Sequence, residues 1–219
     1  MKIRNLISHK IDSDFSRVVS LLFVLFVDHG ILRLLWRNFA MVDDKVIRSN
    51  HLGNFHLAYL KKNGLRSIVN LRGGQQFAHN AFEKEFCQKN KLAYYSVPLA
   101  STEWPSKQAL LKLIEIFENA DPKILVHCKS GADRTGLVVG VYLIWKLKLT
   151  GNEAKKNLSL RFLHWKYGKK GILGKFFDHY DETNDGTTDF RDWVKFCYLE
   201  PTKNNPVTNI NAEKSKKGN

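Results

Sequence analysis

The sequence of 219 residues contains little cysteine, and its three cysteines are not spaced for pairing or for metal binding. The number of cysteines is odd, and no two of them form a C-x-x-C pair: they are Cys87, Cys128 and Cys197. This pattern argues against a disulfide framework or a zinc site, and it favours a reducing compartment. No metal-ligand cluster is visible elsewhere in the sequence. We therefore expect a protein that needs no metal and no cofactor.

The sequence also lacks an apolar run long enough to cross a membrane. VVSLLFVLFV (18–27) is apolar for ten residues, whereas a spanning helix needs about 20. No good signal-peptide cleavage site follows it, so we expect a cytoplasmic protein in which this segment is a buried or interfacial helix. The alternative is membrane association through residues 18–37. That contact would use Phe23, Phe26, Leu34, Leu35 and Trp36 together with Arg33 and Arg37.

Acidic residues are few compared with basic ones. The chain has 21 Asp and Glu against 35 Lys and Arg, which gives a formal net charge of +14. Such a balance favours anionic partners: phosphorylated substrates, acidic lipids or nucleic acid. Nucleic acid is not expected, because nothing beyond the charge supports it.

The composition is 43% apolar, enough for one core. We divide the chain into an N-terminal extension (1–40), one domain (41–200) and a basic tail (201–219). The tail has almost no apolar content and is predicted to be disordered.

Short apolar runs alternate with longer helical patterns along the predicted domain. This order predicts an α/β fold: a central, mostly parallel sheet with helices on both faces. Ligands bind beyond the C-terminal ends of the strands in such folds. Strands are expected at 45–49, 66–71, 92–99 and 123–128, and helices at 54–64, 78–90, 106–120, 135–149, 151–163, 172–182 and 188–199.

The segment HCKSGADRTG (127–136) joins the last predicted strand to a helix, and its residue types suit a phosphate-binding loop. Backbone N–H groups at a helix N-terminus bind a phosphate dianion, and Gly131 lets the backbone curl. Arg134 offers a planar fork for two phosphate oxygens. This positive environment lowers a thiol pKa, so Cys128 is predicted to be a nucleophilic thiolate. Thr135 can donate a hydrogen bond to its sulfur.

The remaining loop residues have supporting roles in this interpretation. His127 is expected to order the loop backbone. Cys87 and Cys197 are expected to be buried, although Cys87 could form a disulfide with an oxidised Cys128 if the fold brings them close. The predicted phosphate-binding set is Lys129, Ser130, Gly131, Ala132, Asp133 and Arg134.

The loop resembles the His-Cys-x5-Arg-Ser/Thr-Gly signature of the cysteine-dependent protein tyrosine and dual-specificity phosphatases. The stretch from Asp28 to Trp165 is similar to bacterial members of that superfamily, with VIRSN, GLRSIVNLRG and VPLASTEWPS in the expected order. The resemblance implies metal-free hydrolysis of phosphate monoesters through a phosphocysteine, on phosphorylated proteins. Two alternatives stay open: a phosphoinositide or other small phosphate ester as substrate, which Lys129 would favour, or a pseudophosphatase that binds phosphate without turnover.

The general acid is the point at which the sequence departs from that family. No Asp occurs from Lys91 to Ala120, where many members carry the acid on a loop before the cysteine. Asp133 is our first candidate and Glu103 the alternative; Asp133 could instead be a loop-ordering carboxylate paired with Arg134. Arg72 is expected either to face the cleft or to pair with a carboxylate. Four residues are assigned to the fold or the surface: His164, Tyr167, Asp178 and His179.

Overall fold

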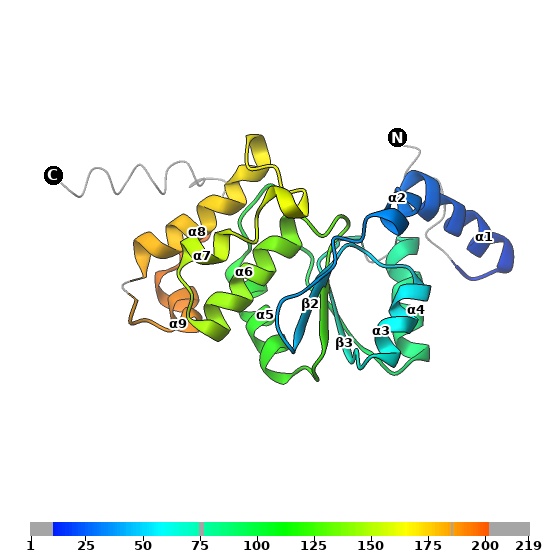
Figure 1. The fold of residues 1–219 in the computed structure, drawn as a ribbon, viewed down its shortest axis with the longest axis horizontal. Helices are drawn as coiled ribbons and strands as arrows, with labels where there is room; N and C mark the ends of the chain where they lie inside the picture. The colour runs from blue at the N-terminus through cyan, green and yellow to red at the C-terminus, as the bar shows by residue number, and fades with distance from the viewer. Residues whose placement is uncertain (1–10, 75–76, 185, 202–219) are drawn as a thin grey trace.

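The fold is built around a five-stranded sheet, seen in a computed structural model that describes residues 11–74, 77–184 and 186–201 (Figure 1). The strand order is β1-β2-β5-β3-β4. Edge strand β1 runs antiparallel to β2, and the other neighbours are parallel. The sheet is thus mostly parallel, as predicted. The strands are β1 (Ala40–Met41), β2 (Val46–Ser49), β3 (Ser67–Asn70), β4 (Ala93–Ser96) and β5 (Ile124–His127).

Helices cover both faces of this sheet, which confirms the predicted fold class. Figure 1 shows α3 and α4 on one side and α5 and α6 on the other. The α-helices are α1 (Asp14–Leu22), α2 (Gly30–Leu35), α3 (Asn54–Lys62), α4 (Ala78–Lys89), α5 (Lys107–Asn119), α6 (Asp133–Leu147), α7 (Gly151–Lys155), α8 (Ile172–Thr183) and α9 (Phe190–Asp192). Single turns of other helix types are η2 (Phe23–Val27), η3 (Leu160–Phe162), η4 (Gly168–Gly171) and η5 (Trp193–Cys197).

The predicted elements occur in the predicted order, with differences at their ends. Helix α6 begins at Asp133, two residues before the predicted start, so that Asp133 and Arg134 lie in its first turn. The predicted helix over 151–163 ends at Lys155, and a separate 3-10 turn follows. Strand β1 was not predicted, because two residues are too few to show an alternating pattern; pairing with β2 forms it.

The core is divided by the sheet into separate clusters. Successive strand residues point to opposite faces, so Val126 packs in the cluster on the α5 and α6 side and Leu125 in the cluster on the α3 and α4 side. Cys128 belongs to the first cluster and Cys87 to the second. Both thiols are free. The structure therefore does not bring Cys87 to Cys128 as the disulfide hypothesis requires. Cys197 is only partly buried, contrary to expectation.

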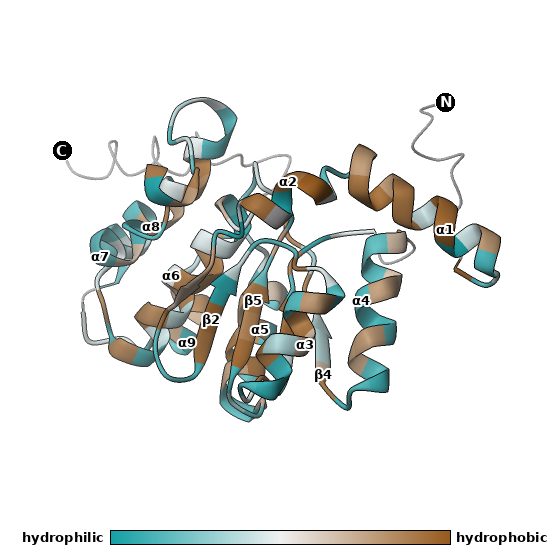
Figure 2. Ribbon diagram, turned by 45° about the vertical axis from the view of Figure 1, so that its right-hand side comes forward, coloured by the Kyte–Doolittle hydropathy of each residue, from teal (hydrophilic) through white to brown (hydrophobic). Residues whose placement is uncertain are grey.

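The N-terminal extension forms α1, η2 and α2 beside α4 (Figure 1). Ser13 caps α1, and an ion pair of 2.8 Å between Arg17 and Glu85 ties α1 to α4. Figure 2 shows how hydrophobic these helices are. Phe26 and Leu35 are 62% and 89% exposed, so the prediction of a buried helix is wrong, and the interfacial helix stays a prediction. Within the described ranges, no helix combines the length and the hydropathy needed to cross a bilayer. The tail predicted to be disordered lies, beyond residue 201, outside the described residues.

Candidate active site

The loop that contains the signature runs from the C-terminal end of β5 to the first turn of α6. Gly131 allows its tight course. The residue has a φ of +73°, and a Cβ there would lie 2.7 Å from the backbone of Ser49 and Asn50, at the end of β2. Only glycine combines this conformation with this close approach. The backbone therefore curls against the neighbouring strand as the sequence predicted.

The sulfur of Cys128 lies at the base of the loop and is buried, with the residue 1% exposed. Burial alone would raise the pKa of the thiol. The charge of Arg134, the hydroxyl and N–H of Thr135 and the N–H of Gly131 outweigh burial, so the pKa of Cys128 is lowered from its ordinary value. These groups stabilise the thiolate at the place where the sequence predicted a nucleophile.

The guanidinium of Arg134 is oriented by the ends of two neighbouring strands. Its Nη1 donates to the carbonyl oxygens of Leu71, 3.2 Å away after β3, and of Leu99, 3.5 Å away after β4. Its Nε is buried and has no hydrogen-bond partner among the described residues. A guanidinium held in this way keeps a donor available for an anion, as a phosphate-binding arginine requires.

Groups outside the signature fix the backbone of the loop. Arg48, on β2, donates from Nη2 to the carbonyl oxygen of Gly131 at 2.9 Å and lies 3.4 Å above the Phe162 ring. Burial lowers its pKa to about 10, so it stays cationic at neutral pH. Asn38 donates to the carbonyl oxygen of Ser130 at 3.0 Å. These contacts hold the loop carbonyls away from the anion site, and they leave its N–H groups for an anion.

Asp133 is buried under the loop, and each of its carboxylate oxygens has a cationic or imidazole partner. Oδ1 lies 2.8 Å from Nδ1 of His164, and Oδ2 lies 2.8 Å from Nζ of Lys170. Burial would raise the pKa of Asp133, but the hydrogen bonds from His164 and Lys170 prevail and lower it. A carboxylate cannot donate a proton, so these contacts support the loop-ordering alternative. Asp133 thus pairs with His164 and not with the predicted partner Arg134. From the sequence, His164 was expected to belong to the fold or the surface.

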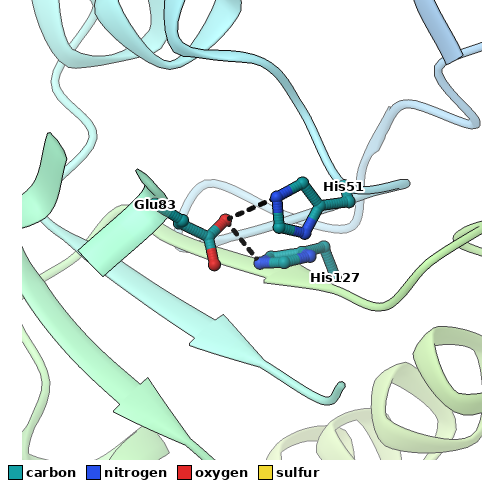
Figure 3. A group of neighbouring side chains, drawn as sticks. All are labelled: His51, Glu83 and His127. Carbon is teal, nitrogen blue, oxygen red and sulfur yellow. Dashed lines mark ion pairs between the residues drawn. The ribbon is translucent and has the colours of Figure 1, made fainter. Parts of the chain in front are cut away.

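His127 points to the opposite side of the loop, where it joins a buried cluster (Figure 3). Its Nδ1 lies 3.3 Å from the carbonyl oxygen of Cys128, which fits the predicted role of ordering the backbone. Its Nε2 lies 2.8 Å from Oε1 of Glu83, on α4. His51, after β2, faces the same carboxylate oxygen at 4.0 Å. Oε2 of Glu83 accepts from Asn70 at 2.6 Å. These residues lie far apart in the sequence, so no sequence motif indicated the cluster.

Lys129 and Arg72 both form ion pairs with Asp28, a carboxylate of the N-terminal extension. Asp28 lies 2.9 Å from Arg72, 2.9 Å from Arg33 and 3.0 Å from Lys129. Burial would raise the pKa of Asp28, but these cations lower it. Arg72 thus pairs with a carboxylate, which is one of its two predicted roles. The extension contributes directly to the surroundings of the loop, and no pattern in the sequence indicated this contact.

Glu103, the alternative acid, is exposed on the loop after β4. No hydrogen bond or ion pair joins its carboxylate to the signature loop in the described part of the chain. The same loop begins near the site, because Leu99 accepts from Arg134. Both acid assignments stay predictions.

Comparisons with known proteins agree with this geometry. Residues 45–148 match a family model described as "Polymorphic toxin system, DSP-PTPase phosphatase". Inositol diphosphatase DSP3 of Arabidopsis thaliana is 29% identical over 57% of this chain and 64% of its own. Tyrosine-protein phosphatase CDC14 of Candida albicans is 31% identical over 44% of this chain and 17% of its own. The chain thus spans less than two thirds of the length of these relatives.

Solved structures share the fold. TpbA of P. aeruginosa has a TM-score of 0.52 and 17% identity, over 73% of this chain and 89% of that one. The catalytic core of the PP-IP phosphatase SIW14 from S. cerevisiae has a TM-score of 0.53 and 24% identity. The likeness covers 67% of this chain and 87% of that one. The fold and the loop define a phosphatase-like α/β domain. Over residues 45–148, the chain is similar to the tyrosine and dual-specificity phosphatases.

Proposed function

We propose that this chain hydrolyses phosphate monoesters of proteins through a phosphocysteine on Cys128. The observation that supports this most directly is the lowered pKa of Cys128 beneath a loop whose N–H groups and Arg134 can hold a phosphate. The thiolate attacks phosphorus, the S–P bond forms, and the ester P–O bond breaks as the leaving oxygen takes up a proton. Water then attacks phosphorus, the S–P bond breaks, and phosphate leaves with the thiolate restored.

The Cys128→Ser variant tests the nucleophile. Its hydrolysis of an aryl phosphate should fall to background, while binding of a phosphate analogue persists, because the loop and Arg134 remain. Wild-type activity should also survive a strong chelator, since neither the Cys128 thiolate nor the Arg134 guanidinium needs a metal to act. Retained turnover in Cys128→Ser would refute the phosphocysteine, and a wild-type protein without turnover that still binds phosphate would be a pseudophosphatase.

Phosphorylated protein is the substrate class that the surroundings of the loop favour. Lys129 would favour a multiply phosphorylated small substrate if its ammonium were free to contact one, but the ammonium is held 3.0 Å from Asp28, beside Arg72. Turnover should be compared on phosphotyrosine and phosphoserine peptides, phosphoinositides and inositol pyrophosphates. A higher kcat/KM on the inositol compounds than on every peptide would contradict this proposal and support the alternative.

Contact with a membrane surface through residues 18–37 is the second part of the proposal. Phe26 and Leu35 are exposed together with Val27 and Leu32, and the net charge of +14 complements acidic lipid. The full chain should sediment with vesicles that contain phosphatidylserine, and a Phe26→Glu/Leu35→Glu variant should not. Phe55→Glu, an exposed aromatic on α3, is the matched control. Equal sedimentation of all three proteins would refute the contact.

We further propose that the protein works in the reducing cytoplasm. A low-pKa thiolate is readily oxidised, so Cys128 needs a reducing compartment to remain a nucleophile. Fractionation of cells that express the full chain checks this placement, and recovery from an exported fraction would contradict it.

A further inference from the structure

A buried cluster behind the signature loop offers three metal-ligand atoms that face one another (Figure 3). It consists of His51, Glu83 and His127, which come from the ends of β2 and β5 and from α4. The three ligand atoms lie within 4.8 Å of one another, and all three residues are buried. We propose that this cluster binds one divalent cation of the zinc type.

The spacing of the donor atoms suits such an ion. Zinc bonds to nitrogen and oxygen are about 2.0–2.2 Å long, so donors around a tetrahedral ion lie ~3.4 Å apart. The observed separations from Oε1 of Glu83 are 2.8 Å to Nε2 of His127 and 4.0 Å to Nε2 of His51. Against this ~3.4 Å spacing, the first separation is too short and the second too long, each by about 0.6 Å. Small side-chain rotations would therefore accommodate an ion. Two imidazoles and one carboxylate are a donor set that zinc accepts.

The outer contacts of the ligands also fit a metal site. A metal-bound histidine generally donates its other ring nitrogen to a carbonyl or carboxylate, and ligand carboxylates accept hydrogen bonds in turn. Nδ1 of His127 lies 3.3 Å from the carbonyl oxygen of Cys128, and the second oxygen of Glu83 accepts from Asn70. These contacts orient Nε2 of His127 and Oε1 of Glu83 toward the common centre.

A cavity of about 390 Å³ borders this cluster and offers space for a fourth ligand. His51 and Glu83 line it, and so does His79, whose ring centroid lies 5.6 Å from that of His51. Nε2 of His79 and Nδ1 of His51 are buried and have no hydrogen-bond partner among the described residues. The two arginines in the wall form ion pairs, Arg17 with Glu85 and Arg33 with Asp28, a carboxylate that Arg72 and Lys129 share. Three protein ligands with an open side are typical of an exchangeable zinc site.

The test uses the full chain with Cys128→Ser, because thiolates themselves bind zinc. Zinc bound per chain is measured after dialysis, and the affinity is measured by competition with a chromophoric chelator. This parent should bind one zinc, and adding Glu83→Gln or His51→Asn should weaken binding at least ~10-fold. Glu85→Gln, on the same helix, and His56→Asn are matched controls that should bind like the parent. The result does not depend on catalysis, because the parent is inactive by design.

A second readout keeps the proposal falsifiable if a ligand variant unfolds. Cobalt bound to the Cys128→Ser chain should show the visible bands of a four-coordinate nitrogen and oxygen site, without a thiolate charge-transfer band. Each of three results would overturn the proposal. A folded Cys128→Ser chain could bind no zinc, both ligand variants could bind zinc as tightly as this parent, or the cobalt spectrum could show a thiolate band.

Discussion

Replacing Asp133 by Asn separates the two roles left open for this carboxylate. In the structure, Asp133 accepts from His164 and pairs with Lys170. Asn keeps the shape and one acceptor but presents an amide N–H to the second donor. A hydrogen bond to a charged group contributes about 1.5–3 kcal/mol, and Lys170 is about half exposed, which reduces its share. We expect the free energy of unfolding to fall by about 2–3 kcal/mol, which for a chain of this size lowers Tm by about 4–12 °C.

The pH dependence of that loss follows from the lowered pKa of Asp133. A depressed carboxyl pKa stabilises the fold above the unfolded value of about 3.9, and the contribution disappears as the pH falls through the folded pKa. The Tm difference between wild type and Asp133→Asn should therefore be constant near neutral pH and shrink below about pH 5. Calorimetric scans of both proteins from pH 7 down to the acid limit of folding measure it. A difference that stays constant or grows on acidification would refute the ion-pair reasoning.

Kinetics on two substrates tests the catalytic role of the same residue. A general acid contributes about 10²–10⁴-fold for a poor leaving group and little for an activated one. If Asp133 only orders the loop, Asp133→Asn should lose the same factor of kcat on an alkyl and on an aryl phosphate. Glu103→Gln is the matched variant, and we expect it to show the leaving-group dependence if Glu103 is the acid. A selective loss on the alkyl phosphate in Asp133→Asn would instead establish Asp133 as the acid. If neither variant shows the dependence, another group or water delivers the proton.

Three further predictions concern the loop and its surroundings. Alkylation of Cys128 should titrate below the ~8.5 of a free cysteine, and Thr135→Val should raise that midpoint because a hydrogen bond to the sulfur is lost; an unchanged midpoint would contradict this. Arg48→Lys should reduce kcat, and it should lower the free energy of unfolding by about 1.5–3 kcal/mol. The reason is that the hydrogen bond to Gly131 and the stacking on an aromatic ring need a guanidinium. Steady-state rates measure the first effect and urea titration the second. Peroxide should oxidise Cys128 without forming a bridge to Cys87, whose pKa is raised to about 12 by burial, and a linked peptide pair in the mass spectrum of the native protein would refute this.

The parts of the fold that the sequence predicted are those set by local pattern. The short apolar runs and the longer helical patterns predicted the strands and helices, because strand and helix periods are visible within a few residues. The signature loop was equally readable, since its function depends on a short contiguous segment. Gly131, placed in the sequence as a turn former, has the positive φ that this role requires.

The residues that sequence reasoning missed reach the site through tertiary contacts. Glu83 lies on the buried face of α4, and its carboxylate faces His127 at the end of β5. His164 follows a 3-10 turn in place of the predicted helix, and that turn carries it to Asp133. Asp28 reaches Lys129 only because α1 and α2 pack beside α4. No local pattern encodes these distances, so a single sequence cannot show which polar side chain ends beside the loop.

The contacts around Cys128 also bear on the choice between an enzyme and a phosphate-binding module. A module would need only the loop N–H groups and Arg134, since these bind an anion without any nucleophile. Arg134, Thr135 and the N–H of Gly131 in addition lower the pKa of Cys128, in spite of the burial that would raise it. Stabilising a buried thiolate contributes nothing to binding a phosphate dianion, because two negative charges in one cradle repel each other. This arrangement therefore favours attack on phosphorus over retention of the anion.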